Sequence, residues 1–268
     1  MRPPISLPLL KLMSSMILIL WPCFVARAEV AVSLPPLAGL VHLLDSQVDT
    51  FCLLPSNADP HHFSMTPRLL ERLRHSDTLI RTSRDDQGWP GLNTGMRQID
   101  LWPNHDHAWL NPGKVLDVLP GLAREIQALY PDRKISVADS LTRFRELIKV
   151  LDAEVSEKLT SVRKTGVILQ HASWKSFCEY YNIPILAIAE SNKLEGALGP
   201  KQLEKLLNIL HQHPKAYLWG DQGHSNLTLE WLSARMNGKH IILLDPLGSC
   251  SDPWDQLLRN NISRMTER

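Results

Sequence analysis

Short apolar runs alternate with amphipathic segments along most of the chain. The runs VAVS (30–33), VDTFCLLP (48–55) and DTLIRTS (77–83) have the length and composition of buried strands, and the helical patterns PPLAGLVHLL and PRLLERLRH separate them. The alternation restarts further on, with strands expected at 166–170, 184–189, 216–220 and 240–245 and helices at 174–181, 199–213, 227–236 and 252–265. This pattern predicts an α/β fold with largely parallel sheets.

A longer helical pattern separates the two α/β stretches. Its apolar residues recur every three or four positions, at Leu141, Phe144, Ile148, Leu151, Val155, Leu159 and Val162. A helix of this length spans about 35–40 Å, and no Gly or Pro interrupts its stripe. We therefore expect two similar α/β lobes (29–135 and 164–268), joined by one long rigid helix over 136–163.

The first 28 residues have the pattern of a cleaved signal peptide. Arg2 and Lys11 precede an apolar core, and Ala26-Arg27-Ala28 provides a small-x-small cleavage site. The apolar core is shorter than the ~20 residues that a membrane-spanning helix needs. We expect a secreted, soluble protein.

Charge argues against one class of partner. Three of the 29 Lys and Arg residues lie in the predicted signal peptide, which leaves 26 against 28 Asp and Glu residues. A basic surface for nucleic acid is therefore not expected.

Candidate metal ligands follow the predicted strands of both lobes. His171 and Asp245 come directly after strands, His61 follows a strand by a short loop, and His107 ends the long polar loop 84–106. Ligands of open α/β sheets bind beyond the carboxyl ends of the strands, so these side chains can meet in a cleft between the lobes. Three imidazoles and one carboxylate form a set suited to zinc, and less specifically to other divalent metals.

Other polar residues near these positions are expected to be structural. His62 and His105 are interpreted as solvated neighbours of the candidate ligands. His224, after WGDQG, lies near a predicted strand end, where a role in the cleft is the less favoured of its two interpretations, and Asp221 at the same edge is interpreted as structural.

The motifs around the candidates resemble those of the zinc- and manganese-specific substrate-binding proteins of bacterial ABC transporters. NADPHHFSMTP is similar to the family motif P-H-x-[YF]-x-x-x-P and places the first ligand at His61 rather than His62. HAWLNP, QHASWKSFCEYYNI and LLDPLG are similar to the motifs that carry the remaining ligands, at His107, His171 and Asp245. In that family a histidine at the third position accompanies zinc and an acid accompanies manganese, so the resemblance implies zinc.

The resemblance also implies a function. A monomer would bind Zn(II) with high affinity in the periplasm and deliver this transported ligand to an ABC-type membrane permease. No catalysis is expected. A Mn(II)- or Fe(II)-binding member of the same family is the alternative. The sequence leaves open whether Asp245 or water completes the metal shell.

The chain departs from the family pattern at three places. Ala172 replaces the aspartate that follows the third histidine, so another group must orient His171. The span between the first two ligands is short and lacks a long metal-collecting loop. The segment 190–203 lacks the family's Glu-Pro-Ser helix start.

A secreted zinc hydrolase is the rival from a different class. Three histidines and Asp245 as a general base could form its site. The chain has no H-E-x-x-H pair, and a fourth protein ligand would close the metal to water, so we do not expect an enzyme.

Three cysteines remain after the signal peptide, enough for one disulfide and one free thiol. Cys178 and Cys250 both lie in the second lobe, a few residues past a candidate ligand, and are predicted to pair. Cys52 is predicted to be buried and free.

Overall fold

The computed structural model describes residues 29–267 except 57, 93–94, 133–135 and 191–197. The predicted signal peptide lies outside this part of the chain. Within the described residues, no helix has both the length and the apolar character needed to cross a membrane.

The first lobe is built on a parallel four-stranded sheet in the order β2-β1-β3-β4. Its strands are β1 (Val30–Val32), β2 (Thr50–Cys52), β3 (Thr78–Arg81) and β4 (Arg97–Asp100), and its helices are α1 (Pro35–Leu44), α2 (Pro67–Arg74) and α3 (Pro112–Leu129). β1 is fully buried in the centre of the sheet. β4 was not predicted, because it is a half-exposed edge strand of mostly polar residues within the expected loop 84–106.

The second lobe repeats this arrangement with the order β6-β5-β7-β8, again entirely parallel. Its strands are β5 (Val167–Leu169), β6 (Ile185–Ile188), β7 (Tyr217–Asp221) and β8 (Ile241–Leu244), and its helices are α6 (Lys175–Tyr180), α7 (Pro200–Gln212) and α8 (Leu227–Arg235). Numbered within each lobe, both sheets have the order 2-1-3-4. The expected pair of similar α/β lobes is therefore confirmed.

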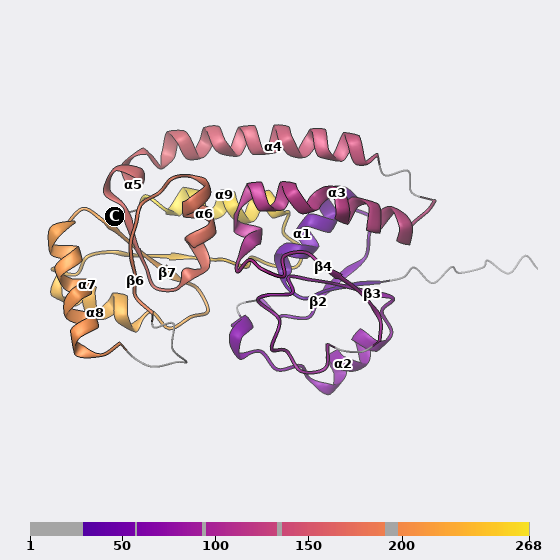
Figure 1. The fold of residues 1–268 in the computed structure, drawn as a ribbon, viewed down its shortest axis with the longest axis horizontal. Helices are drawn as coiled ribbons and strands as arrows, with labels where there is room; N and C mark the ends of the chain where they lie inside the picture. The colour runs from indigo at the N-terminus through magenta and orange to yellow at the C-terminus, as the bar shows by residue number, and fades with distance from the viewer. Residues whose placement is uncertain (1–28, 57, 93–94, 133–135, 191–197, 268) are drawn as a thin grey trace, which may run out of the picture.

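A long helix, α4 (Val137–Lys158), runs along both lobes (Figure 1). The hydroxyl of Ser136 caps it by accepting a hydrogen bond from the backbone N–H of Asp139, at 3.1 Å. The apolar stripe is buried as expected, and α4 packs on α3 of the first lobe. The helix ends earlier than predicted, because the chain turns at Leu159 and continues as the short helix α5 (Thr160–Thr165).

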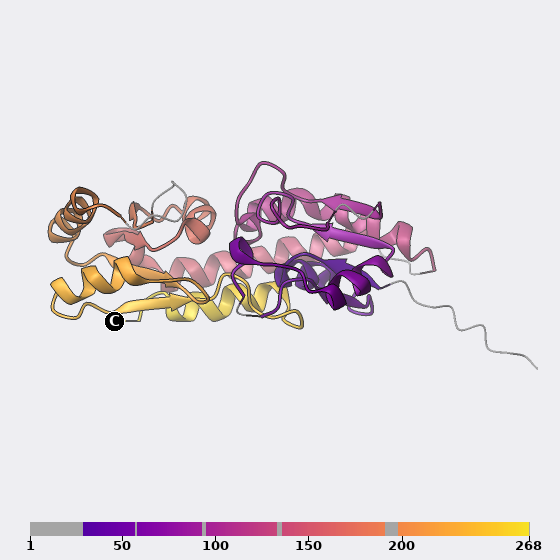
Figure 2. The ribbon, with the colours of Figure 1, turned by 90° about the horizontal axis from the view of Figure 1, so that it is seen from below.

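The last helix, α9 (Trp254–Arg264), forms a second link between the lobes. It follows the final strand of the second lobe but packs on α1 and beside α4, as Figures 1 and 2 show. The indole N–H of Trp254 donates to the carbonyl of Trp109 at 2.8 Å, and that of Trp109 donates to the carbonyl of Pro246 at 2.7 Å. Gly39 lets α1 approach the start of α9 closely, since a Cβ at this position would lie 2.7 Å from the backbone nitrogen of Trp254. One continuous apolar core therefore includes residues of both lobes.

The disulfide joins Cys52 to Cys250, with a Cα–Cα distance of 5.9 Å. The predicted pairing of Cys178 with Cys250 is wrong. Among the described residues Cys178 is the free cysteine, fully buried in α6, where burial raises the pKa of its thiol far above the usual range. Because α9 returns to the first lobe, the loop that carries Cys250 reaches the end of β2, a contact that residue positions along the chain do not reveal.

Candidate metal centre

Four histidines lie together where the two lobes face each other. His61 sits in the short 3-10 turn η1 (Pro60–His62), and His107 immediately precedes the turn η2 (Ala108–Leu110). His171 precedes the turn η3 (Ala172–Trp174), and His224 lies in the loop from β7 to α8. Each follows the carboxyl end of a strand, and each lobe contributes two imidazoles, which is the placement expected for a ligand site of parallel α/β sheets.

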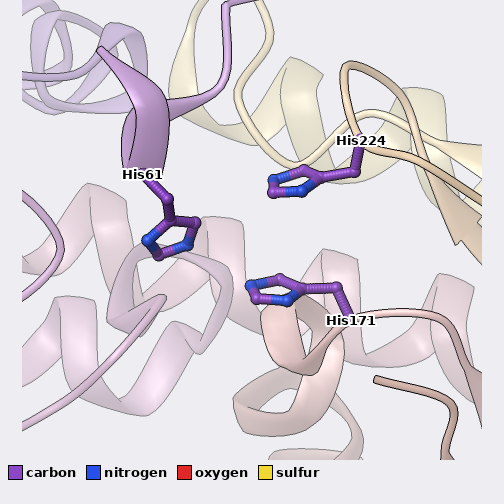
Figure 3. A group of neighbouring side chains, drawn as sticks. All are labelled: His61, His171 and His224. Carbon is purple, nitrogen blue, oxygen red and sulfur yellow. The ribbon is translucent and has the colours of Figure 1, made fainter. Parts of the chain in front are cut away.

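Three of the four are close enough to share one ion. One ring nitrogen from each of His61, His171 and His224 lies within 4.8 Å of the other two. Figure 3 shows the His171 and His224 rings lying one above the other, with His61 facing them across the gap. The ring centroids of His61 and His171 are 5.2 Å apart, and those of His171 and His224 are 4.8 Å apart. Nitrogens around a tetrahedral zinc lie about 3.3 Å from one another, so small side-chain movements would complete the site.

His107 is the fourth imidazole, with its ring centroid 5.3 Å from that of His171 and 6.0 Å from that of His61. Its backbone adopts the left-handed conformation, with φ 49° and ψ 34°, and its N–H donates to Oδ1 of Asp85 at 3.0 Å. The side chain is buried, and its Nδ1 has no hydrogen-bond partner within the described structure. A strained backbone and a buried, unpaired nitrogen are typical of a residue held in place for a ligand.

The structure does not place Asp245 in this group of imidazoles. Its Oδ1 accepts hydrogen bonds from the backbone N–H groups of Leu247 and Gly248, both at 2.9 Å. Asn261 holds the Asp245 backbone through its side-chain amide, at 2.7 and 2.8 Å. The carboxylate thus stabilises the turn after β8, and its role as a ligand stays a prediction.

His62 does not belong to the group of ligand atoms that contains His61. Its Nδ1 lies 2.9 Å from Oδ2 of Asp59, and 58% of its side chain is exposed. Asp221 is buried at the end of β7, where it accepts hydrogen bonds from Ser173 and from the indole of Trp174, in line with its expected structural role.

Glu190 orients His171 in place of the missing aspartate at position 172. Its carboxylate bonds to Nδ1 of His171, while Nε2 of the same ring is buried without a partner in the described part of the chain. A carboxylate on the outer ring nitrogen fixes the tautomer and leaves the other nitrogen to bind metal. Residues 191–197, which follow Glu190 in the segment that departs from the family pattern, lie outside the described residues.

The pKa shifts favour metal binding at three of the four rings, because they keep those rings neutral. Burial, followed by the neighbouring imidazoles, holds the pKa of His107 well below 6.5, and burial lowers the pKa of His61 and of His224. At His171 burial acts in the same direction, but the hydrogen bond and negative charge of Glu190 outweigh it and raise the pKa. Three rings are thus neutral near pH 7, the form that binds metal, whereas His171 must give up a proton more often.

Comparison with known proteins agrees with this geometry. The model of the ZnuA family, described as zinc-uptake complex component A, periplasmic, matches residues 30–268.

The chain belongs to this family.

Two relatives illustrate its range. A putative metal-binding protein of Chlamydia muridarum is 22% identical over 204 residues, which cover 70% of this chain and 73% of that protein. The high-affinity zinc uptake system protein ZnuA of Haemophilus ducreyi is 21% identical over 273 residues, which cover 84% and 86% of the two chains.

Solved structures of the same fold contain different metals. A crystal structure of ZnuA superimposes with a TM-score of 0.74 at 22% identity, covering 90% of this chain and 100% of that one. The substrate-binding protein FpvC from Pseudomonas aeruginosa, solved in complex with Mn²⁺, has a TM-score of 0.70 at 14% identity, covering 90% and 99%. These structures share the fold of this chain, and similarity of fold does not fix the metal.

Sequence reasoning missed the carboxylates that surround the histidines. Glu190 lies two residues after the end of the apolar strand β6, just as His171 lies two residues after the end of β5. Asp85 and Asp59 lie in polar loops, where only the fold shows which of several acids face an imidazole.

Proposed function

We propose that this protein binds a single Zn²⁺ between its lobes in the periplasm and delivers it to an ABC-type membrane permease for uptake. His61, His107 and His171 hold the ion. The observation that carries the proposal is that imidazoles from both lobes lie together: among the described residues, His61 and His171 belong to a group of ligand atoms that contains no carboxylate, and the His107 ring lies beside them. Zinc is well suited to imidazole, whereas manganese is better served by carboxylate and carbonyl oxygens.

Membership of the ZnuA family supports transport rather than catalysis. The relative from H. ducreyi is named as a zinc-uptake component, and binding of metal by side chains of two lobes suits a carrier that must enclose its cargo. The manganese-bound FpvC makes Mn(II) the competing metal, with Fe(II) as the further alternative.

Metal competition tests the proposal. Protein purified from the periplasm of cells expressing the full chain should, after demetallation, bind one equivalent of Zn²⁺ and only weakly Mn²⁺. His61→Ala, His107→Ala and His171→Ala should each weaken zinc binding by more than ~100-fold, since even the residues that orient a ligand cost about that much. His62→Ala is the matched control, because that residue adjoins a ligand in the sequence but has an exposed ring outside the group of ligand atoms. Tight Mn²⁺ binding at neutral pH would contradict the assignment of zinc.

Delivery needs a separate test in cells. Zinc uptake under chelation should fall when the chain is removed and recover with the unaltered protein but not with His171→Ala. Uptake that does not depend on the chain would contradict its role in transport.

A further inference from the structure

His224, and not Asp245, lies in the group of ligand atoms with His61 and His171. We propose that His224 is the fourth metal ligand, so that the site consists of four imidazoles, two from each lobe. This inference rests on the proposed binding of zinc by His61, His107 and His171. The His224 ring lies nearly parallel to the His171 ring, with an interplanar angle of 13°, and the centroid of the His224 ring is 5.9 Å from that of His61. Only 13% of its side chain is exposed.

Hydrogen bonds and two glycines fix the backbone of the loop that carries His224. The amide of Asn226 donates to the carbonyls of Asp221 and His224, at 3.0 and 3.1 Å, and its oxygen accepts from the Asp221 N–H at 3.1 Å. Gly220 makes room for this amide, since a Cβ there would lie 2.4 Å from Oδ1 of Asn226. Gly223 supplies the turn, with φ 82°. The backbone of His224 is thus fixed before any ion binds, which reduces the entropy lost on binding.

Asp59 stands beside the His224 ring as other carboxylates stand beside the other rings. Its Oδ1 lies 3.5 Å from Nε2 of His224 and accepts a hydrogen bond from the backbone N–H of His61 at 2.8 Å. One acid of the first lobe therefore positions a histidine from each lobe.

The same pairing recurs around the cluster. Glu190 bonds to Nδ1 of His171, and Asp85 accepts a hydrogen bond from the backbone N–H of His107 at 3.0 Å. A carboxylate next to a metal-binding histidine orients the ring and raises its basicity. His224 shares this arrangement with His107 and His171, which is the second observation that marks it as a ligand. It also distinguishes His224 from Asp245, whose own carboxylate oxygen is engaged by the turn after β8.

Four neutral imidazoles have a chemical consequence. They leave the full charge of a divalent ion on the site, to be balanced by the neighbouring carboxylates of Asp59, Asp85 and Glu190. Such a set favours zinc and the later first-row divalent ions over manganese more strongly than three imidazoles and a carboxylate would. His224 is thus the residue that sharpens metal specificity.

The test compares His224→Ala with Asp245→Asn, using a chelator competition for Zn²⁺ on the periplasmic protein and circular dichroism to verify folding. His224→Ala should weaken zinc binding by more than ~100-fold, and Asp245→Asn should leave it unchanged. Unchanged binding in His224→Ala, or an equal loss in Asp245→Asn, would overturn the inference. His61→Ala separates the two proposals, because zinc binding that survives this change would contradict the site as a whole.

A gain of function provides the second variant. His224→Asp should still bind metal while the preference for Zn²⁺ over Mn²⁺ decreases at least tenfold, a result that misfolding cannot produce. An unchanged ratio would show that residue 224 does not contact the ion. The absorption spectrum of bound Co²⁺ should change in His224→Asp and stay the same in His62→Ala, and the converse result would overturn the inference.

Discussion

Removing the disulfide should destabilise the protein strongly, because it closes a very long loop. Cys52 and Cys250 are 198 residues apart in the sequence. In the chain-entropy model, a cross-link over that distance lowers the entropy of the unfolded chain by an amount worth about 5 kcal/mol at 25 °C. Both cysteines are only half buried, so an alanine at either position adds little cavity cost. We expect Cys52→Ala to lower the free energy of unfolding by about 3–5 kcal/mol.

Urea unfolding of the metal-free protein measures this loss. Metal must be absent, because a tightly bound ion would stabilise the folded state of both proteins and mask the difference. The unaltered protein should lose the same 3–5 kcal/mol when a reductant is added, whereas Cys52→Ala should not respond to reductant.

Cys178→Ala is the control that tells the two pairings apart. Cys178 is free and buried, so its removal costs packing energy but should preserve the response to reductant. If that response vanished in Cys178→Ala, or if Cys52→Ala cost less than about 1 kcal/mol, the link between β2 and the loop before α9 would be refuted.

Three further outcomes are expected. Glu190→Gln should weaken zinc binding by about 10–100-fold. It should also lower the pKa of His171, so calorimetry in two buffers at pH 6.5 should show that fewer protons are released when zinc binds. Unchanged proton release would contradict the role of Glu190. Gly39→Ala should destabilise the protein by about 1–3 kcal/mol in thermal unfolding, since its Cβ would meet the backbone at Trp254, whereas Gly121→Ala in α3, with nothing within 4 Å of its Cβ, should be neutral or stabilising. X-ray scattering should show nearly the same radius of gyration with and without zinc, because α4, α9 and the disulfide all join the lobes. Hydrogen exchange near His107 and His171 should slow when zinc binds. A closure of the lobes by tens of degrees would contradict this rigidity.

The sequence alone determined the features that depend on local order. Apolar runs and 3.6-residue periodicity specified nearly all helices and strands, because the spacing of apolar residues within each segment decides which face is buried. The same order placed His61 and His171 after strand ends and His107 at the end of a long loop, and parallel sheets bring strand ends to one edge. β4 escaped detection because a half-exposed edge strand has no apolar run to reveal it.

Only the tertiary structure decided which distant groups meet. α9 follows the last strand of the second lobe, yet its packing on α1 carries Cys250 to Cys52 and leaves Cys178 unpaired. The choice between His224 and Asp245 also depends on the turns that follow β7 and β8, since each begins at a strand end and only one directs its side chain into the cluster. Contacts of this kind depend on how helices and loops pack across the two lobes, so they cannot be predicted from the order of residues within one segment.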